Sequence, residues 1–159
     1  MLFRSLIRYP TTRLLIVGDG SERDTLIRMV HAFGIKPHVV FKGWKDDLRD
    51  DYQFADCYLL TSNYEGYGRT VIEALASGLP VIMTDVGVAG ETIQNEVNGL
   101  VVPVGDIEQL VSAMERILTD KALRSKFSQA GREFIRTLPS KAEYLYAYKN
   151  SWETCGKQM

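Results

Sequence analysis

The sequence has 159 residues and a mass of 18.0 kDa, with 45% hydrophobic and 25% charged residues, an ordinary globular composition with enough chain for one core. Its net charge is −1, so the sequence lacks the basic excess that drives binding to nucleic acid. Nucleic acid is therefore excluded as a partner. Arg4 and Arg8 interrupt the apolar N-terminal residues, no apolar run is long enough to span a bilayer, and Cys57 and Cys155 form no CxxC pair. We therefore expect a cytoplasmic protein.

Short apolar runs alternate with helical periods along the chain, a pattern typical of a parallel sheet with helices on both faces. The predicted fold class is therefore α/β. Residues 1–9 resemble the last turns of an amphipathic helix, and a chain that starts on such a helix looks truncated at its N-terminus. The predicted strands are Arg13–Val17, His38–Phe41, Asp56–Leu60, Pro80–Thr84 and Gly99–Val102.

The helices between these strands are predicted from their ends. Ser21 and Asp24 resemble a capping box that opens a helix, and Gly34 closes that helix. Gly78 ends the helix that follows the third strand. A later helix begins at Asp106. One face of it carries Leu110, Ala113, Met114, Ile117 and Leu118.

The chain is predicted to be mostly helical after about residue 103, ending in a helical tail. In the tail, Tyr144, Tyr148 and Trp152 are spaced four residues apart and share one face. Packing of this face on the same domain is the favoured interpretation, and a cofactor or acceptor surface is the alternative. The basic residues of these helices indicate a solvated face, with peripheral contact to a membrane as the alternative. They are Lys121, Arg124, Lys126, Arg132 and Arg136.

Glu65 and Glu73 flank a Gly-x-Gly turn and the helix predicted to begin near Gly68 or Arg69. The free N–H groups and the macrodipole of a helix N-terminus attract phosphate. A rise of about 1.5 Å per residue puts Glu73 roughly 6 to 8 Å along the axis, about the reach from a diphosphate to a ribose. A carboxylate only accepts hydrogen bonds, so both glutamates are interpreted as binding hydroxyl groups. Two solvated surface glutamates are the alternative.

Several motifs in sequence order resemble the C-terminal domain of the family 4 (group 1) glycosyltransferases, retaining enzymes built from two Rossmann-like domains. The matching segments are residues 14–20, 40–43, 55–56, 65–73, 76–82, 84–87, 98–102 and 105–106. The resemblance implies that residues 1–159 form a nucleotide-sugar-binding, Rossmann-like domain with a helical C-terminal tail. This domain would be one half of a GT-B glycosyltransferase, and the N-terminal acceptor domain would be absent.

The implied function is transfer of a sugar from a nucleotide-diphosphate sugar to an acceptor with retention of configuration. This chain would bind the donor, whereas a glycan, lipid-linked or small-molecule acceptor would bind through the missing domain. We therefore expect the isolated chain to bind nucleotide sugars weakly and to transfer negligibly. No cofactor or metal ion is implied, since the nucleotide sugar is a substrate. A nucleotide-sugar epimerase and a noncatalytic sugar-nucleotide sensor or interaction domain are the alternatives.

The resemblance also implies roles for single residues. Glu65, the catalytic candidate, would contact hydroxyl groups of the donor sugar, and Glu73 would hold the ribose. The amides of Gly66, Tyr67 and Gly68 would face the sugar and the diphosphate. The full set of implied donor-binding residues is Gly18, Gly20, Gly43, Trp44, Ser62, Glu65, Gly66, Tyr67, Gly68, Arg69, Thr70, Val71 and Glu73.

Five residues of this set have more specific expectations. Thr70 and Val71 match positions that meet the phosphates. Arg69 would either neutralise a phosphate or remain solvated, and the sequence supports these two interpretations equally. Gly43 and Trp44 match the nucleobase edge, with a turn and a packed tryptophan as the alternative for Trp44.

The loop with Gly18 and Gly20 follows a strand and precedes a helix, as a dinucleotide-binding loop does. Arg23 replaces the third glycine and Asp19 adds negative charge, so nicotinamide binding is not expected. The resemblance implies that the two glycines approach the donor. A plain turn between strand and helix is the alternative. A separate acidic cluster, formed by Asp46, Asp47, Asp50 and Asp51, indicates the first turn of a helix in preference to a metal site.

Overall fold

The computed structural model of the chain describes residues 8–156. Strands and helices alternate up to residue 84, a loop without a helix leads to the last strand, and helices follow residue 102. The strands are β1 Leu14–Val17, β2 Val39–Gly43, β3 Tyr58–Leu60, β4 Val81–Thr84 and β5 Gly99–Val102. The helices are α2 Arg23–Ala32, the 3-10 turn η1 Lys36–His38, α3 Arg49–Phe54, α4 Arg69–Ala76, α5 Ile107–Thr119, α6 Lys121–Thr137 and α7 Lys141–Gly156. All five predicted strands are confirmed, with small shifts at their ends.

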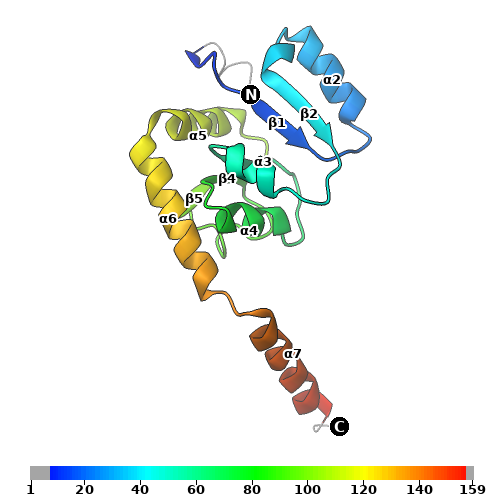
Figure 1. Cartoon of the computed structure of the whole chain (residues 1–159), viewed down its shortest axis with the longest axis vertical. Helices are drawn as coiled ribbons and strands as arrows, with labels where there is room; N and C mark the ends of the chain where they lie inside the picture. Colours follow the sequence, from blue (N-terminus) through cyan, green and yellow to red (C-terminus); the bar gives the residue numbers. More distant parts are fainter. Residues whose placement is uncertain (1–7, 157–159) are drawn as a thin grey trace.

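Every strand pair is parallel, as predicted, but the described residues form two sheets (Figure 1). One sheet pairs β1 with β2, and the other has the order β3-β4-β5. Helices α2 and α4 provide crossovers between neighbouring parallel strands. Parallel strands end at the same edge of their sheet, so the loops that follow β3 and β4 are neighbours, at the edge where α/β proteins bind ligands.

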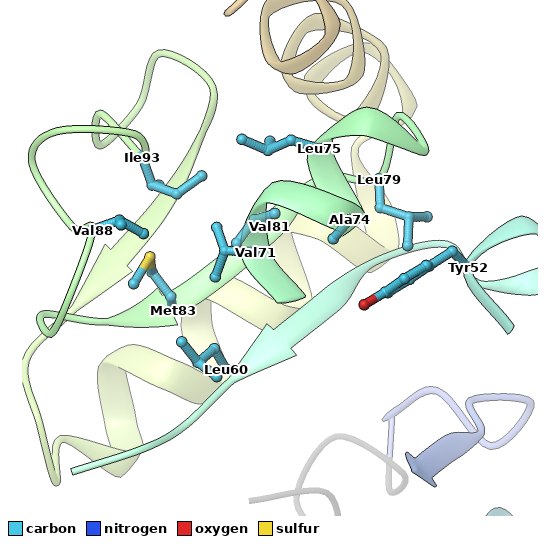
Figure 2. Close-up of a cluster of buried hydrophobic side chains, with 10 residues drawn as sticks. All are labelled: Tyr52, Leu60, Val71, Ala74, Leu75, Leu79, Val81, Met83, Val88 and Ile93. Atoms are coloured by element: carbon cyan, nitrogen blue, oxygen red, sulfur yellow. The ribbon is translucent and has the colours of Figure 1, made fainter. Parts of the chain in front are cut away.

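Strand β4 is the centre of the domain, and all four of its residues are buried. Successive side chains of a strand point to opposite faces. Val81 and Met83 therefore join a cluster under α4, which Figure 2 shows. Ile82 joins a second cluster with residues of α5 and with Leu100 and Val102 of β5. Helices thus cover both faces of this sheet, as predicted.

Helix α6 packs against both α4 and α5 and holds them together. Phe127 of α6 is fully buried in the cluster on the α5 side. Gly131 lies directly against Leu75 of α4, since a Cβ atom placed on this glycine would be 2.7 Å from Leu75 Cδ2. The short side chain therefore permits the close approach of the two helices.

Most predicted helix ends are confirmed, but one is wrong. Gly34 and Gly78 follow α2 and α4 with φ of 65° and 79°, a conformation that glycine adopts readily. The Asp106 side chain accepts a hydrogen bond from the Gln109 amide and caps α5. Ser21, by contrast, does not cap α2. That helix begins at Arg23 without a side-chain cap, because the preceding Glu22 already has helical φ and ψ.

The preferred interpretation of the C-terminal tail is also wrong. Tyr144, Tyr148 and Trp152 are 60%, 54% and 69% exposed, and the Tyr148 ring lies beside the rings of the other two. Leu138 takes an extended conformation after α6, so α7 projects away from the sheets (Figure 1). Helical spacing identifies the shared face but does not say what covers it. The N-terminal helix predicted over residues 1–9 falls largely on residues 1–7, which lie outside the described residues.

Candidate functional site

Glu65 lies in the loop that follows β3, and two hydroxyl groups hold it there. The Ser62 hydroxyl donates to Glu65 Oε1 at 2.6 Å. The Thr84 hydroxyl, at the end of β4, donates to the Ser62 carbonyl oxygen, also at 2.6 Å. Thr84 is buried, and its hydrogen bond attaches the loop after β3 to the neighbouring strand. The predicted site residues Ser62 and Glu65 are therefore brought together, and the carboxylate has a defined orientation.

Gly87, in the loop after β4, lies close to the Cβ atom of the same glutamate. A Cβ atom at Gly87 would lie 3.0 Å from Glu65 Cβ, and the φ of Gly87 is 54°. The sequence analysis assigned no role to Gly87 or Thr84. Both follow from the parallel pairing of β3 and β4, because it places their carboxyl-end loops side by side.

Helix α4 begins at Arg69, as predicted, and Gly68 precedes it with φ 75° and ψ 52°. Within residues 8–156, the amides of Gly68, Arg69 and Thr70 have no hydrogen-bond acceptor. These amides and the helix macrodipole form a site suited to an anion. Val71 differs, because its amide donates to the Gly68 carbonyl oxygen and its side chain is fully buried. Gly66 and Tyr67 are exposed in the preceding turn.

Glu73 lies one turn further along α4 and is contacted by two residues. The Tyr52 hydroxyl donates to Glu73 Oε2 at 3.3 Å. The Arg69 guanidinium is 3.7 Å from Glu73 Oε1, and the two side chains are 86% and 42% exposed. Arg69 is therefore largely solvated and lies near Glu73, and neutralisation of a phosphate by Arg69 stays a prediction.

Thr70 is contacted by a second tyrosine. The Tyr58 hydroxyl donates to Thr70 Oγ1 at 2.7 Å. The rings of Tyr52 and Tyr58 pack edge to face, with centroids 6.1 Å apart. Burial raises the pKa of both phenols, and for Tyr52 the charge of Glu73 adds to this effect, so both remain hydrogen-bond donors. Neither tyrosine was predicted from the sequence, because both precede the motif and belong to α3 and β3.

The loops after β1 and β2 meet at a second place. The Gly18 amide donates to the Gly43 carbonyl oxygen at 2.7 Å, and their φ values are 123° and 68°. Trp44 is 75% exposed, and its indole N–H donates to Asp46, so the packed-tryptophan interpretation is wrong. Gly20 is exposed. Among the described residues, no hydrogen bond or ion pair joins these loop residues to Glu65 or Glu73.

The model of the family described as glycosyl transferases group 1 matches residues 2–134. This chain belongs to that family. The lipopolysaccharide core biosynthesis glycosyltransferase LpsE of Rhizobium meliloti is 33% identical over 134 residues, which are 84% of this chain and 39% of the relative.

Two solved structures are similar in fold to this group 1 chain. Sucrose-phosphate synthase from Thermosynechococcus elongatus has a TM-score of 0.87 and 29% identity, covering 99% of this chain and 42% of that chain. Anabaena HepE in complex with UDP-glucose has a TM-score of 0.79 and 22% identity, covering 93% and 42%. The chain thus spans about two fifths of the length of each of these proteins.

The acidic cluster of this group 1 chain forms ion pairs. Asp50 and Asp51 lie in the first turn of α3, as predicted. The buried Asp51 binds Lys42 at 2.5 Å and Lys45 at 2.7 Å, and Asp47 pairs with Arg49. In the part of the chain that the structure describes, no group of three or more His, Cys, Asp or Glu residues is placed to hold a metal ion.

Asp51 links the two loop regions, because its lysine partners lie at the end of β2 and its neighbour Tyr52 contacts Glu73. The hydrogen bonds from Lys42 and then Lys45 lower the pKa of Asp51. A lowered pKa means that the pairing contributes stability above the unfolded value of about 3.9 and loses it as the pH falls further.

We therefore expect Asp51→Asn to lower the free energy of unfolding at neutral pH. The difference in free energy of unfolding between the variant and the original chain should narrow below about pH 3.9. The Asp51 carboxyl group of the original chain is then increasingly protonated and loses its charge. Urea denaturation across this range measures the effect, with Asp50→Asn as the matched control. A difference that stays constant with pH would contradict the assigned pairing.

Burial raises the pKa of the Cys57 thiol to about 12, so this thiol stays protonated and inert at neutral pH. None of the helices in residues 8–156 combines the length and the apolar character needed to cross a membrane.

Proposed function

We propose that this chain is the donor-binding half of a retaining, family 4 glycosyltransferase that uses a nucleotide-diphosphate sugar. One observation carries the proposal: along the chain, the unpaired amides at the start of α4 lie between two glutamates, and each carboxylate accepts a hydrogen bond from a hydroxyl group. A sugar, a diphosphate and a ribose follow one another in such a donor. Glu65, the α4 amides and Glu73 follow one another in the same order.

The proposed chemistry uses each part of this arrangement. The bond between the sugar and the diphosphate breaks, a bond from the sugar to an acceptor oxygen forms, and the acceptor hydroxyl gives its proton to an oxygen of the departing diphosphate. Negative charge grows on the departing diphosphate, where the amides of Gly68 to Thr70 and the helix macrodipole would stabilise it. Glu65 would orient the sugar through its hydroxyl groups, and Glu73 would hold the ribose. The acceptor would bind to a part of the whole protein outside this chain.

The similar structure of HepE suggests which nucleotide to test first. HepE, which shares the fold, was solved with UDP-glucose. UDP and UDP-glucose are therefore the first probes, and GDP, ADP and their glucose conjugates complete the panel.

Titration calorimetry of the 159-residue chain tests the proposal with Glu65→Ala and Glu73→Ala. We expect Glu73→Ala to weaken nucleoside diphosphate and nucleotide sugar equally, by about tenfold, because one hydrogen bond to a charged group is lost in each complex. Glu65→Ala should weaken only the nucleotide sugar. Glu133→Ala, which removes an exposed carboxylate of α6, is the matched control and should change neither affinity.

Two results would contradict the proposal. If the chain binds none of the nucleotides, the interaction-domain alternative is favoured. If Glu73→Ala binds as tightly as the original chain, Glu73 does not hold the ribose.

A further inference from the structure

We propose that Tyr52 and Tyr58 form a positioning pair that sets the Glu73 carboxylate for the ribose and the Thr70 hydroxyl for the phosphate. The inference rests on the proposed function and adds two residues to it. Neither tyrosine is expected to touch the nucleotide. Each would act through the α4 residue that accepts its hydrogen bond.

The pair is built from two elements and lies under the start of α4. Tyr52 belongs to α3 and is 7% exposed, and Tyr58 belongs to β3 and is partly buried. Their rings pack edge to face at an angle of 65°, so each ring restricts the other. Figure 2 shows Tyr52 at the edge of the cluster under α4, beside Ala74 and Leu79. Both hydroxyl groups are therefore held by packed rings.

Tyr52 restricts the Glu73 carboxylate. An exposed glutamate rotates freely, but the buried Tyr52 hydroxyl donates to Oε2 and selects one orientation. Arg69 reaches the other oxygen only at 3.7 Å, from a side chain that is 86% exposed, and such pairs restrict little. The carboxylate keeps further acceptor positions, which can receive the two neighbouring ribose hydroxyl groups.

Tyr58 controls the proton of Thr70. A hydroxyl group has one donor and two acceptor positions, and Thr70 Oγ1 accepts the Tyr58 proton at 2.7 Å. The Thr70 proton is then available to an anion at the helix start, beside the unpaired amides of Arg69 and Thr70. Hydrogen bonds in such a chain strengthen one another. The Tyr52 hydroxyl also lies 3.4 Å from the Thr70 carbonyl oxygen, so the two tyrosines meet at one residue.

The roles of the two tyrosines can be separated with phenylalanine variants, which keep the rings and remove the hydroxyl groups. The probes are the diphosphate among UDP, GDP and ADP that the chain binds most tightly, and the 2′,3′-dideoxy form of the same diphosphate. We expect Tyr52→Phe to weaken the diphosphate roughly three- to tenfold and to leave the dideoxy form unchanged. Tyr58→Phe should weaken both forms by an equal factor, because both carry the phosphates.

Tyr146→Phe is the matched control, since it removes the same hydroxyl group from an exposed position on α7 and should change neither affinity. The inference would be overturned if Tyr52→Phe kept the ratio of affinities, diphosphate over dideoxy form, that the original chain shows. An equal loss for both forms together with a lower melting temperature would also overturn it, because that pattern indicates a purely structural role. If Glu73→Ala loses this preference for the diphosphate over its dideoxy form and Tyr52→Phe keeps it, only this inference fails. If the original chain binds no nucleotide, the proposed function fails and the inference fails with it.

Discussion

Replacing Phe127 with alanine is expected to lower the free energy of unfolding by about 3–5 kcal/mol, the usual cost of deleting a buried aromatic side chain. Phe127 is fully buried in the cluster that joins β4, β5 and α5. Its removal would leave a cavity at the centre of these contacts, which the surrounding rigid strands can fill only in part. Urea denaturation followed by circular dichroism measures the change.

Phe54→Ala is the matched control for this prediction, because the same side chain is removed from a position that is 89% exposed. We expect its effect to stay within about 0.5 kcal/mol. The contrast also bears on the candidate site, since α6 carries both Phe127 and Gly131, and Gly131 packs against α4. Equal effects of the two substitutions would mean that α6 does not hold α4 and α5 together as described.

Gly87→Ala is expected to weaken binding of a nucleotide sugar by displacing Glu65. The new Cβ atom would lie 3.0 Å from Glu65 Cβ, so Glu65 must move and its hydrogen bond with Ser62 is strained. We expect the affinity for the nucleotide sugar to fall about 10- to 100-fold, the range for losing a hydrogen bond to a charged group. Affinity for the nucleoside diphosphate alone should change little, because Glu73 and the α4 amides stay in place.

A second glycine in the same loop separates this effect from backbone strain. Gly90 also has positive φ, 82°, but a Cβ atom there would have no neighbour within 4 Å. Both substitutions should cost about 1–2 kcal/mol of stability, because alanine is strained in this conformation. Only Gly87→Ala should weaken the nucleotide sugar. If Gly90→Ala weakens it equally, the loop acts through its backbone and not through contact with Glu65.

The local pattern of the sequence determined which segments form strands and helices. The strand Val81–Thr84 is buried at all four positions, and its apolar residues Val81, Ile82 and Met83 are recognisable without a structure because a central parallel strand is covered on both faces. The start of α4 was equally recognisable from the Gly-x-Gly turn that precedes it, and Gly68 of that turn adopts a left-handed conformation. These features depend on residues close together in the chain. The same holds for the pair Ser62 and Glu65, which lie three residues apart.

Only the tertiary structure decided which distant residues support the site. Tyr52 meets Glu73 across 21 positions, and Thr84 meets Ser62 across 22. No periodicity relates such residues, because strand pairing and crossover geometry bring them together. The same reason explains the wrong prediction for α7, whose aromatic face is visible in the sequence although its exposure is not. The sequence by itself determined the elements and the two carboxylates, and the folded chain decided which hydroxyl groups orient them, since those contacts form only when separate strands and helices pack.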